Sequence, residues 1–354
     1  MRSIRLVALV ALVAVLSAWP GHDGPPRADA QQLPGEAIAI AAAPADPLLD
    51  DERQAPRPAR IGKLRFASGF AMKSPDSRFG GVSGIAMLEG GRTALVVTDA
   101  GDWMAWTLRR DGCQLVGIDS GRIGRLADEP GRPLGTRKRD SDAEEIACLW
   151  PGQCLVAYER RHRIMAIANP WEKLRPGTLL GPQAVPDLAS APANDGIEAM
   201  AWTGDRALAL AEGMPAGPDR IAGWVGTPCA GCAPARLDWQ RLAYAVDAGF
   251  KPTGATGLPA GRAGGSGDVL VLERRFKPPV FVAARIRRLD GSRIVAGGDL
   301  QASPVAELWP PRRVDNFEGI AAWSCNGSTH VAIVSDDNFS PLQETLLYEF
   351  VLEE

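Results

Sequence analysis

Histidine and tyrosine are scarce in this chain of 354 residues, with three copies of each, and charge of one sign does not dominate. Three histidines are too few for a histidine-rich zinc enzyme. The formal net charge of −3 argues against a nucleic-acid partner, because a phosphate-binding face needs a net basic surface. No Walker loop, Rossmann fingerprint or nucleophile elbow is present either. These absences exclude the commonest nucleotide-binding and triad chemistries.

Long apolar runs are absent except at the start of the chain. Two arginines precede an uncharged run from Leu6 to Trp19, which suits a signal-peptide core better than a membrane span of about 20 residues. We predict a signal peptide over residues 1–30, with an uncleaved N-terminal anchor as the alternative. Either hypothesis predicts an exported protein, periplasmic or secreted, whose only membrane contact is that N-terminus. Residues 31–61, rich in proline and alanine, are predicted to be a disordered linker.

Six cysteines are consistent with an oxidising compartment. Cys148 and Cys154 flank a turn sequence, so a hairpin would bring them opposite each other. The Cys-x-x-Cys at 229–232 predicts a small loop disulfide, with a redox motif or half of a zinc site as the alternatives. Cys113 and Cys325 remain, and they would pair if the chain closed on itself.

A degenerate repeat runs through the body of the chain. Each copy opens with a polar residue, a small or acidic residue and an aliphatic residue, and a turn and a β-rich run ending in an acid follow. The copies begin at Ser83, Glu144, Glu198, Thr253 and Glu318, and their acids are Asp99, Glu159, Glu212, Glu273 and Asp336.

The first copy predicts what one repeat builds. Apolar runs at 83–88, 93–98, 103–108 and 114–118 alternate with glycine-containing turns, which predicts a four-stranded antiparallel meander. Repetition of such a sheet around an axis buries both of its faces. We therefore predict an all-β fold over residues 62–354, a β-propeller of five to six four-stranded blades. A β-sandwich is the alternative, but its strands would not recur in regular blocks.

A strand from the start of the body is predicted to close the ring. The apolar run from Leu64 to Phe70 belongs to no repeat, and we expect it to pair with residues 346–351. Closure would bring the first and last units together, where Cys113 and Cys325 lie. A sixth, divergent unit would have to come from residues 215–250 or from the termini.

The repeat predicts a ring of carboxylates at one mouth of the channel. Like charges packed together raise one another's pKa unless a cation compensates them. Oxygen ligands without histidine favour a hard ion such as Ca²⁺ over zinc. The alternative is that each acid bonds to backbone groups or to arginine. The predicted calcium ligands are Asp99, Glu144, Glu159, Glu198, Glu212, Glu273, Glu318 and Asp336.

Two arginines follow the acid in the second and fourth copies, at 160–161 and 274–275. Neighbours in a strand face opposite sides, so we expect one arginine of each pair to reach the channel. A guanidinium beside a metal would hold a phosphate or carboxylate, and plain ion pairing with the repeat's own acids is the alternative. The predicted catalytic residues are Arg161, Arg275, Glu159 and Glu273.

Seven segments of the chain resemble the phytase-like, "esterase-like activity of phytase" β-propeller proteins of bacteria. The resemblance covers about residues 62–352 and implies a propeller, hydrolysis of phosphate or carboxylic esters, and calcium bound by channel carboxylates. The sequence lacks an obvious lysine- and tyrosine-rich phytate cradle. The segments are Gly81–Ile85, Asp142–Ile146, Tyr158–Ile164, Asn194–Glu198, Leu272–Arg274, Asp315–Ile320 and Ser335–Ser340.

The combined prediction is an exported hydrolase of phosphoesters or related esters with a small anionic substrate. Calcium would polarise the ester oxygen and activate water. The rival hypotheses are a non-enzymatic propeller that captures a ligand or a protein at the channel mouth, and a lactonase-like propeller with one calcium. The sequence specifies neither the substrate nor the oligomeric state. The ligands expected to carry the reaction are Glu159, Glu198, Glu273, Glu318 and Asp336.

Overall fold

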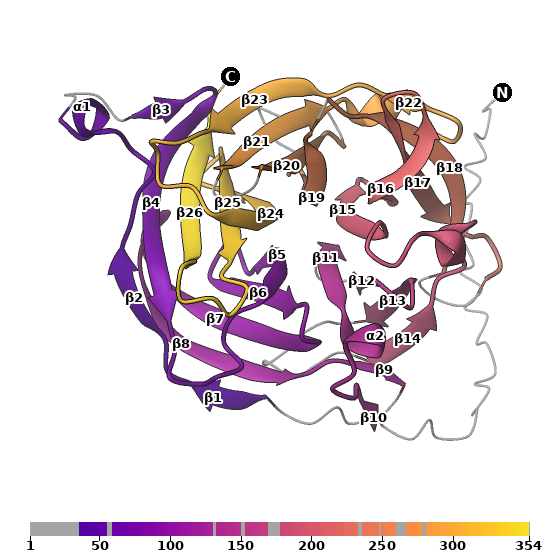
Figure 1. The fold of residues 1–354 in the computed structure, drawn as a ribbon, viewed down its shortest axis with the longest axis horizontal. Coiled ribbons are helices and arrows are strands. Elements are labelled where there is room, and N and C mark those ends of the chain that lie inside the picture. Colours follow the sequence, from indigo (N-terminus) through magenta and orange to yellow (C-terminus); the bar gives the residue numbers. More distant parts are fainter. Residues whose placement is uncertain are drawn as a thin grey trace, which may run out of the picture. The chain divides into compact units, whose positions relative to one another are not determined.

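Five sheets stand around a common axis in the unit Gln31–Glu354 (Figure 1). This computed structural model describes residues 35–54, 59–129, 132–149, 153–168, 178–232, 236–247, 249–259, 267–277 and 281–353. The predicted signal peptide lies outside these residues. Among them, no helix has the length and apolar character needed to span a membrane. The prediction of a β-propeller is confirmed, with five blades.

In each blade the first strand of the repeat is innermost, and the inner strands contact one another in a closed cycle, β5–β11–β15–β19–β24. Blade 1 contains β5 (Val82–Leu88), β6 (Thr93–Thr98), β7 (Asp102–Asp111) and β8 (Gln114–Arg125), with β1 (Glu36–Ile38) at its edge. Blade 2 contains β11 (Ala143–Leu149), β12 (Gln153–Tyr158), β13 (Arg163–Ala168) and β14 (Thr178–Pro182). Blade 3 contains β15 (Ile197–Thr203), β16 (Arg206–Gly217), β17 (Arg220–Pro228) and β18 (Leu237–Ala245), with β22 (Asp299–Leu300) parallel to β18.

Blade 4 contains β19 (Lys251–Gly257), β20 (Val269–Lys277), β21 (Phe281–Leu289) and β23 (Ser303–Leu308). Blade 5 contains β24 (Asn316–Cys325), β25 (Ser328–Asp336), β26 (Thr345–Leu352) and β4 (Leu64–Lys73), with β2 (Ala41–Pro44) and β3 (Arg60–Ile61) at its edge. The remaining elements are the short pair β9 (Ala127–Glu129) and β10 (Arg132–Pro133), the helices α1 (Asp50–Arg53) and α2 (Lys138–Ser141), and 3₁₀ turns at Leu188–Ser190 and Gly291–Arg293. Residues 215–250, considered for a sixth blade, belong mainly to blade 3.

Apolar packing between adjacent blades accounts for the arrangement. The second strand of each blade carries apolar residues on both faces, and every residue of β6 is buried. The described buried residues form five hydrophobic clusters, one for each pair of neighbouring blades. A single blade would leave both of its apolar faces in water, so burial stabilises the closed ring rather than any blade by itself.

The chain closes as the sequence predicts. β4 pairs antiparallel with β26, with Leu64 opposite Leu352 and Met72 opposite Thr345. A disulfide joins Cys113 in blade 1 to Cys325 in blade 5. Disulfides also link the other two predicted cysteine pairs, Cys148–Cys154 and Cys229–Cys232.

The predicted disordered linker over 31–61 requires a correction. Within it, β1 pairs with β8 of blade 1, and β2 pairs with β4 of blade 5. Proline and alanine do not prevent these pairings, because both strands lie at sheet edges where few ladder hydrogen bonds are needed. The segment therefore extends two blades.

Candidate functional site

A β-bulge occurs at the same position of all five inner strands. The register between the first two strands of each blade shifts there, so one residue of the inner strand has no partner. Bulges re-aim side chains and are common next to active sites. The unpaired residues are the first residues of the five repeat copies: Ser83, Glu144, Glu198, Thr253 and Glu318.

An acidic cavity of about 520 Å³ lies at this end of the channel. Four of the five bulged residues line it, together with acids that follow the second strands. Of the residues that the structure describes, seven lining side chains are carboxylic acids and three are cations. The acids are Asp99, Asp142, Glu144, Glu159, Glu198, Glu318 and Asp336, and the cations are Lys138, Arg160 and Arg274.

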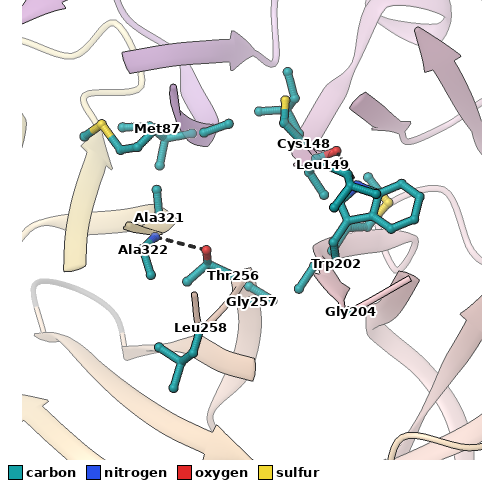
Figure 2. Close-up of a pocket in the computed structure, with 17 residues that line it drawn as sticks. Met87, Cys148, Leu149, Trp202, Gly204, Thr256, Gly257, Leu258, Ala321 and Ala322 are labelled. Atoms are coloured by element: carbon teal, nitrogen blue, oxygen red, sulfur yellow. Dashed lines mark hydrogen bonds between the residues drawn. The ribbon is translucent and has the colours of Figure 1, made fainter. Parts of the chain in front are cut away.

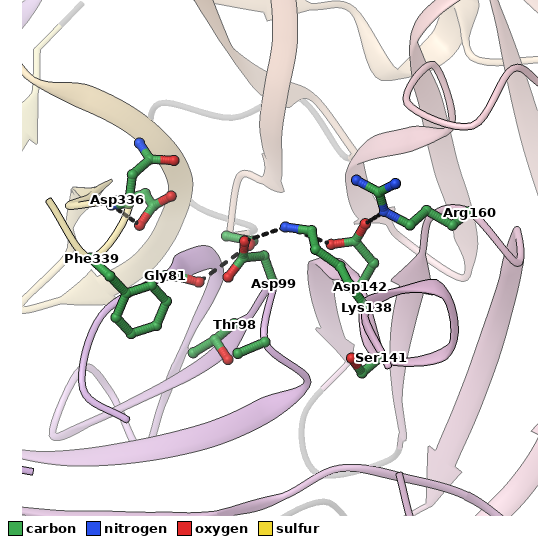
Figure 3. A network of polar contacts seen from close by, with 12 residues as sticks. Gly81, Thr98, Asp99, Lys138, Ser141, Asp142, Arg160, Asp336 and Phe339 are labelled. Atoms are coloured by element: carbon green, nitrogen blue, oxygen red, sulfur yellow. Dashed lines mark hydrogen bonds and ion pairs between the residues drawn. The ribbon is translucent and has the colours of Figure 1, made fainter. Parts of the chain in front are cut away.

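The three cations compensate only part of this charge. Arg274 hydrogen-bonds Glu318 and Asn316 through Nη1. Arg160 donates from Nε to Asp142 Oδ2 at 2.5 Å, and Lys138 Nζ lies 2.5 Å from an oxygen of Asp99 (Figure 3). The excess of acid over base predicts either bound protons or a bound cation.

Two glutamates of the cavity form no ion pair with any described cation. Glu144 lies beside the acids Asp142 and Glu159, and no described lysine or arginine forms an ion pair with it. No described group hydrogen-bonds or ion-pairs with the side chain of Glu198; Arg274 acts on it only at longer range. Burial and neighbouring carboxylates raise the pKa of both glutamates well above the ordinary range.

Raised pKa values extend around the cavity. Burial raises the pKa of Glu159 to about 7, although the N–H of Gly196 donates to its Oε1 at 2.6 Å. Burial likewise raises the pKa of Glu318 to about 7, against the opposing charge of Arg274. The pKa of Asp336 reaches about 8 through burial. These carboxyl groups hold protons near neutral pH unless a cation replaces them.

Asp142, Glu144 and Glu159 form the tightest group of acids, with one oxygen from each within 4.8 Å of the others. Oxygens at calcium-ligand distances of about 2.3–2.6 Å from one ion can be this far apart. Two buried oxygens nearby, Asp142 Oδ1 and Asp99 Oδ1, accept no hydrogen bond. An all-oxygen donor set with unsatisfied buried oxygens fits a hard divalent cation and does not fit zinc.

The structure brings most, but not all, of the predicted site residues to the cavity. Asp99, Glu144, Glu159, Glu198, Glu318 and Asp336 line it. Glu212 lies at its edge, 3.1 Å from Lys251 Nζ and 4.0 Å from Arg274. The remaining three predicted residues lie elsewhere.

Glu273 is fully buried within the blades and does not line the cavity. Tyr244 donates its hydroxyl to Glu273 Oε1 at 2.6 Å, and Arg285 bonds to Oε2. Glu273 pairs with Pro252 on the inner strand of blade 4. In the other blades the residue equivalent to Glu273 is a threonine, tyrosine, alanine or serine, and the acid is the next residue along the strand. In blade 4 that next residue is Arg274, which therefore stands where the other blades have an acid. A shift of one residue along a strand reverses the face of the side chain.

The two predicted arginines also lie outside the cavity. Arg161 is solvent-exposed, 3.8 Å from Asp128 and Asp140. Arg275 stacks over Phe250, with its guanidinium 5.9 Å from the ring centroid. Their neighbours Arg160 and Arg274 line the cavity instead. One arginine of each pair therefore reaches the channel, as expected, but it is not the arginine that the sequence analysis named.

Glu145 closes the channel below the acidic cavity. The equivalent positions in the other inner strands are glycine or alanine, and the buried carboxyl group of Glu145 fills the space they leave. It accepts the N–H of Ile146 at 2.8 Å and of Ala255, across the axis, at 3.1 Å. Beyond it lies a second cavity of about 270 Å³, lined mainly by apolar residues such as Met87, Trp202 and Leu258 (Figure 2).

The sequence prediction missed Lys138, Asp142, Arg160, Arg274 and Asn316. One signal was present: Asp142 and Asn316 each stand two residues before a bulged glutamate. Lys138 carries no such signal, because it reaches the cavity from α2, outside the repeat.

Comparison with known proteins identifies one family. A family model described as Phytase-like, esterase-like activity of phytase, matches residues 77–339. No curated protein matches the sequence. The alignment with a gluconolactonase structure from Xanthomonas campestris covers 90% of this chain and 99% of the gluconolactonase chain, with 11% sequence identity and a TM-score of 0.40. The alignment with a PQQ-bound aldose sugar dehydrogenase from Streptomyces coelicolor covers 83% of this chain and 100% of the dehydrogenase chain, with 14% sequence identity and a TM-score of 0.40. These two likenesses do not bear on activity.

Proposed function

We propose that this chain, which belongs to the Phytase-like family (esterase-like activity of phytase), is an exported, calcium-dependent hydrolase of phosphoesters or related esters. The excess of buried carboxylates in the acidic cavity carries the proposal. Among the described residues, seven acids face three cations there, and Glu198 forms no ion pair with any of them. A divalent cation would replace the protons that otherwise neutralise these groups.

Asp142, Glu144 and Glu159 are the residues that would hold the ion, with Glu198 beside them. When bound, calcium would supply a Lewis acid for the ester oxygen and lower the pKa of a water molecule. Arg274 and Arg160, rather than Arg161 and Arg275, are positioned to bind an anionic oxygen of the substrate.

Glu318 is suited to exchange protons at the reaction centre. Its pKa of about 7 lets it accept a proton near neutral pH, and the bonds to Arg274 and Asn316 hold its carboxylate in place. Glu145 makes the cavity blind at its base, so substrate and product would use the same mouth. Three basic side chains line the cavity among the described residues, which suits one anionic group better than a polyanion.

Export is supported by two features. The N-terminal apolar run follows two arginines, and the six cysteines are joined in three disulfides, as expected in an oxidising compartment. Cell fractionation with the full-length chain, together with N-terminal sequencing of the mature protein, tests this part of the proposal.

The test of the activity combines metal analysis with hydrolysis. We expect purified protein to bind calcium, to melt at a lower temperature in EDTA, and to hydrolyse members of a phosphoester and carboxylic-ester panel. E144Q and E198Q keep the side-chain shape and should lose calcium affinity and activity. E307Q, at an exposed glutamate on β23, is the matched control. Calcium binding without any hydrolysis would contradict the hydrolase and favour a ligand-binding propeller, whereas no bound metal and an unchanged melt would contradict the calcium site itself.

A further inference from the structure

Lys138 supplies a cation between two acids of different blades. It is the first residue of α2, and its Nζ lies 2.5 Å from Asp99 Oδ2 in blade 1 and 3.2 Å from Asp142 Oδ1 at the start of blade 2 (Figure 3). Asp142 is almost completely buried, whereas half of the Lys138 side chain is exposed. The ammonium thus reaches inward from the solvent side to a buried carboxylate.

The acids on both sides of this ammonium have unused oxygens. Asp142 Oδ1 accepts no hydrogen bond and has an ion pair of 3.2 Å with Lys138, and Asp99 Oδ1 accepts no hydrogen bond either. Asp142 is also the acid that shares an oxygen cluster with Glu144 and Glu159. The ammonium therefore lies against the acid cluster that best fits a divalent cation, without satisfying its oxygens.

We propose that Lys138 is a tethered cation that competes with a divalent metal ion for Asp142 and is displaced when the metal binds. This inference rests on the proposed metal site. Lysine is a point charge on a flexible stem, and its exposed side chain can leave without unfolding α2. Arg160 is the less mobile partner, because it holds the other oxygen, Asp142 Oδ2, through its guanidinium. A divalent ion and an ammonium sharing Asp142 would repel each other, so one excludes the other.

The proposal gives Lys138 a defined role. Without metal, its charge offsets the repulsion between Asp99 and Asp142. With metal, the freed ammonium stands at the mouth of the cavity, and Asp142 turns its unsatisfied oxygen to the ion. Calcium affinity is then set partly by how firmly the lysine is held: a competitor bound for about nine-tenths of the time weakens apparent affinity about tenfold.

Calcium titration calorimetry with matched lysine variants tests the competition. K138M removes the charge and keeps the stem, and we expect it to bind calcium about tenfold more tightly than the wild type. K251M is the control. Lys251 is equally exposed and pairs with Glu212 at the same mouth at 3.1 Å, away from Asp142. Its loss should change calcium affinity by less than about threefold, because exposed ion pairs contribute little.

Chemical labelling of the wild-type protein gives a second readout that does not depend on a variant. We expect calcium to speed acetylation of Lys138 by acetic anhydride, measured by peptide mass spectrometry, and to leave the rate at Lys251 unchanged. Equal calcium affinity in all three proteins, or slower acetylation of Lys138 with calcium, would overturn the inference and leave the metal site standing. No calcium binding by any of them would overturn the proposed function and the inference together.

Discussion

Replacing Glu159 with glutamine measures how much the acidic cavity destabilises the metal-free protein. Residue Glu159 is 4% exposed, and its Oε1 accepts the N–H of Gly196, a bond that the amide oxygen of glutamine can keep. Burial raises the pKa of Glu159 from an ordinary value of 4.5 to about 7. The variant therefore removes a charge from a site that disfavours it and changes little else.

The magnitude follows from the two pKa values. Below pH 4.5 both the folded and the unfolded chain keep the proton, and Glu159 does not affect stability. Between pH 4.5 and 7 the unfolded chain loses the proton first, so the free energy of unfolding falls as pH rises and stays reduced above pH 7. At 1.36 kcal/mol per pH unit, the reduction is about 3 kcal/mol at pH 8 and about 1 kcal/mol at pH 5.

Urea unfolding with the disulfides intact, followed by tryptophan fluorescence, provides the assay. In EDTA we expect E159Q to be more stable than the wild type by about 3 kcal/mol at pH 8 and by about 1 kcal/mol at pH 5. With saturating calcium at pH 8 the order should reverse, because glutamine offers a neutral oxygen to the ion. E307Q should match the wild type throughout. A destabilised E159Q in EDTA at pH 8, or a difference that does not change with pH, would refute the reasoning.

Two further predictions concern the channel and the ring closure. E145A should lower the free energy of unfolding by about 2–5 kcal/mol, because it leaves buried N–H groups unsatisfied and opens a cavity. E145Q keeps one acceptor oxygen and should lower it by about 1–3 kcal/mol. Urea unfolding of the two variants measures both losses. Removing the disulfide of Cys113 and Cys325, 212 residues apart, should cost about 5 kcal/mol, against about 2 kcal/mol for Cys148 and Cys154, six residues apart, because the longer loop gains more unfolded-state entropy. Equal losses from the two double cysteine-to-alanine variants would contradict that account.

The fold was predictable because the packing of the blades requires the sequence to repeat. A blade with two apolar faces needs neighbours on both sides, and the same short pattern at each inner strand reveals how often the blade recurs. The ring closure was predictable for the same reason: Leu64–Phe70 is an apolar strand with no blade of its own. The edge strands β1 and β2 were not, because pairing at an edge leaves little trace in composition.

The candidate site was predictable only as far as it follows the repeat. Four cavity residues are the first residues of their repeat copies, so the repeat pattern identifies them directly, and each lies unpaired at a bulge: Ser83, Glu144, Glu198 and Glu318. Lys138 reaches the cavity from a helix between two blades. Its position depends partly on its ion pair with Asp99 in the neighbouring blade, which a local pattern does not contain.

The fourth blade shows how one residue of register alters the chemistry of the ring. The acid in its repeat, Glu273, is buried with Tyr244 and Arg285, and the next residue, Arg274, faces the cavity. Had Glu273 faced inward, the ring would have gained a negative charge and lost a positive one. Arg274 instead pairs with Glu318, while Glu144 and Glu198, on blades 2 and 3, form no ion pair with a cation in the described part of the chain. The departure from five-fold symmetry therefore places the carboxyl groups without an ion-pair partner on one side of the channel, which is where the proposed divalent cation would bind.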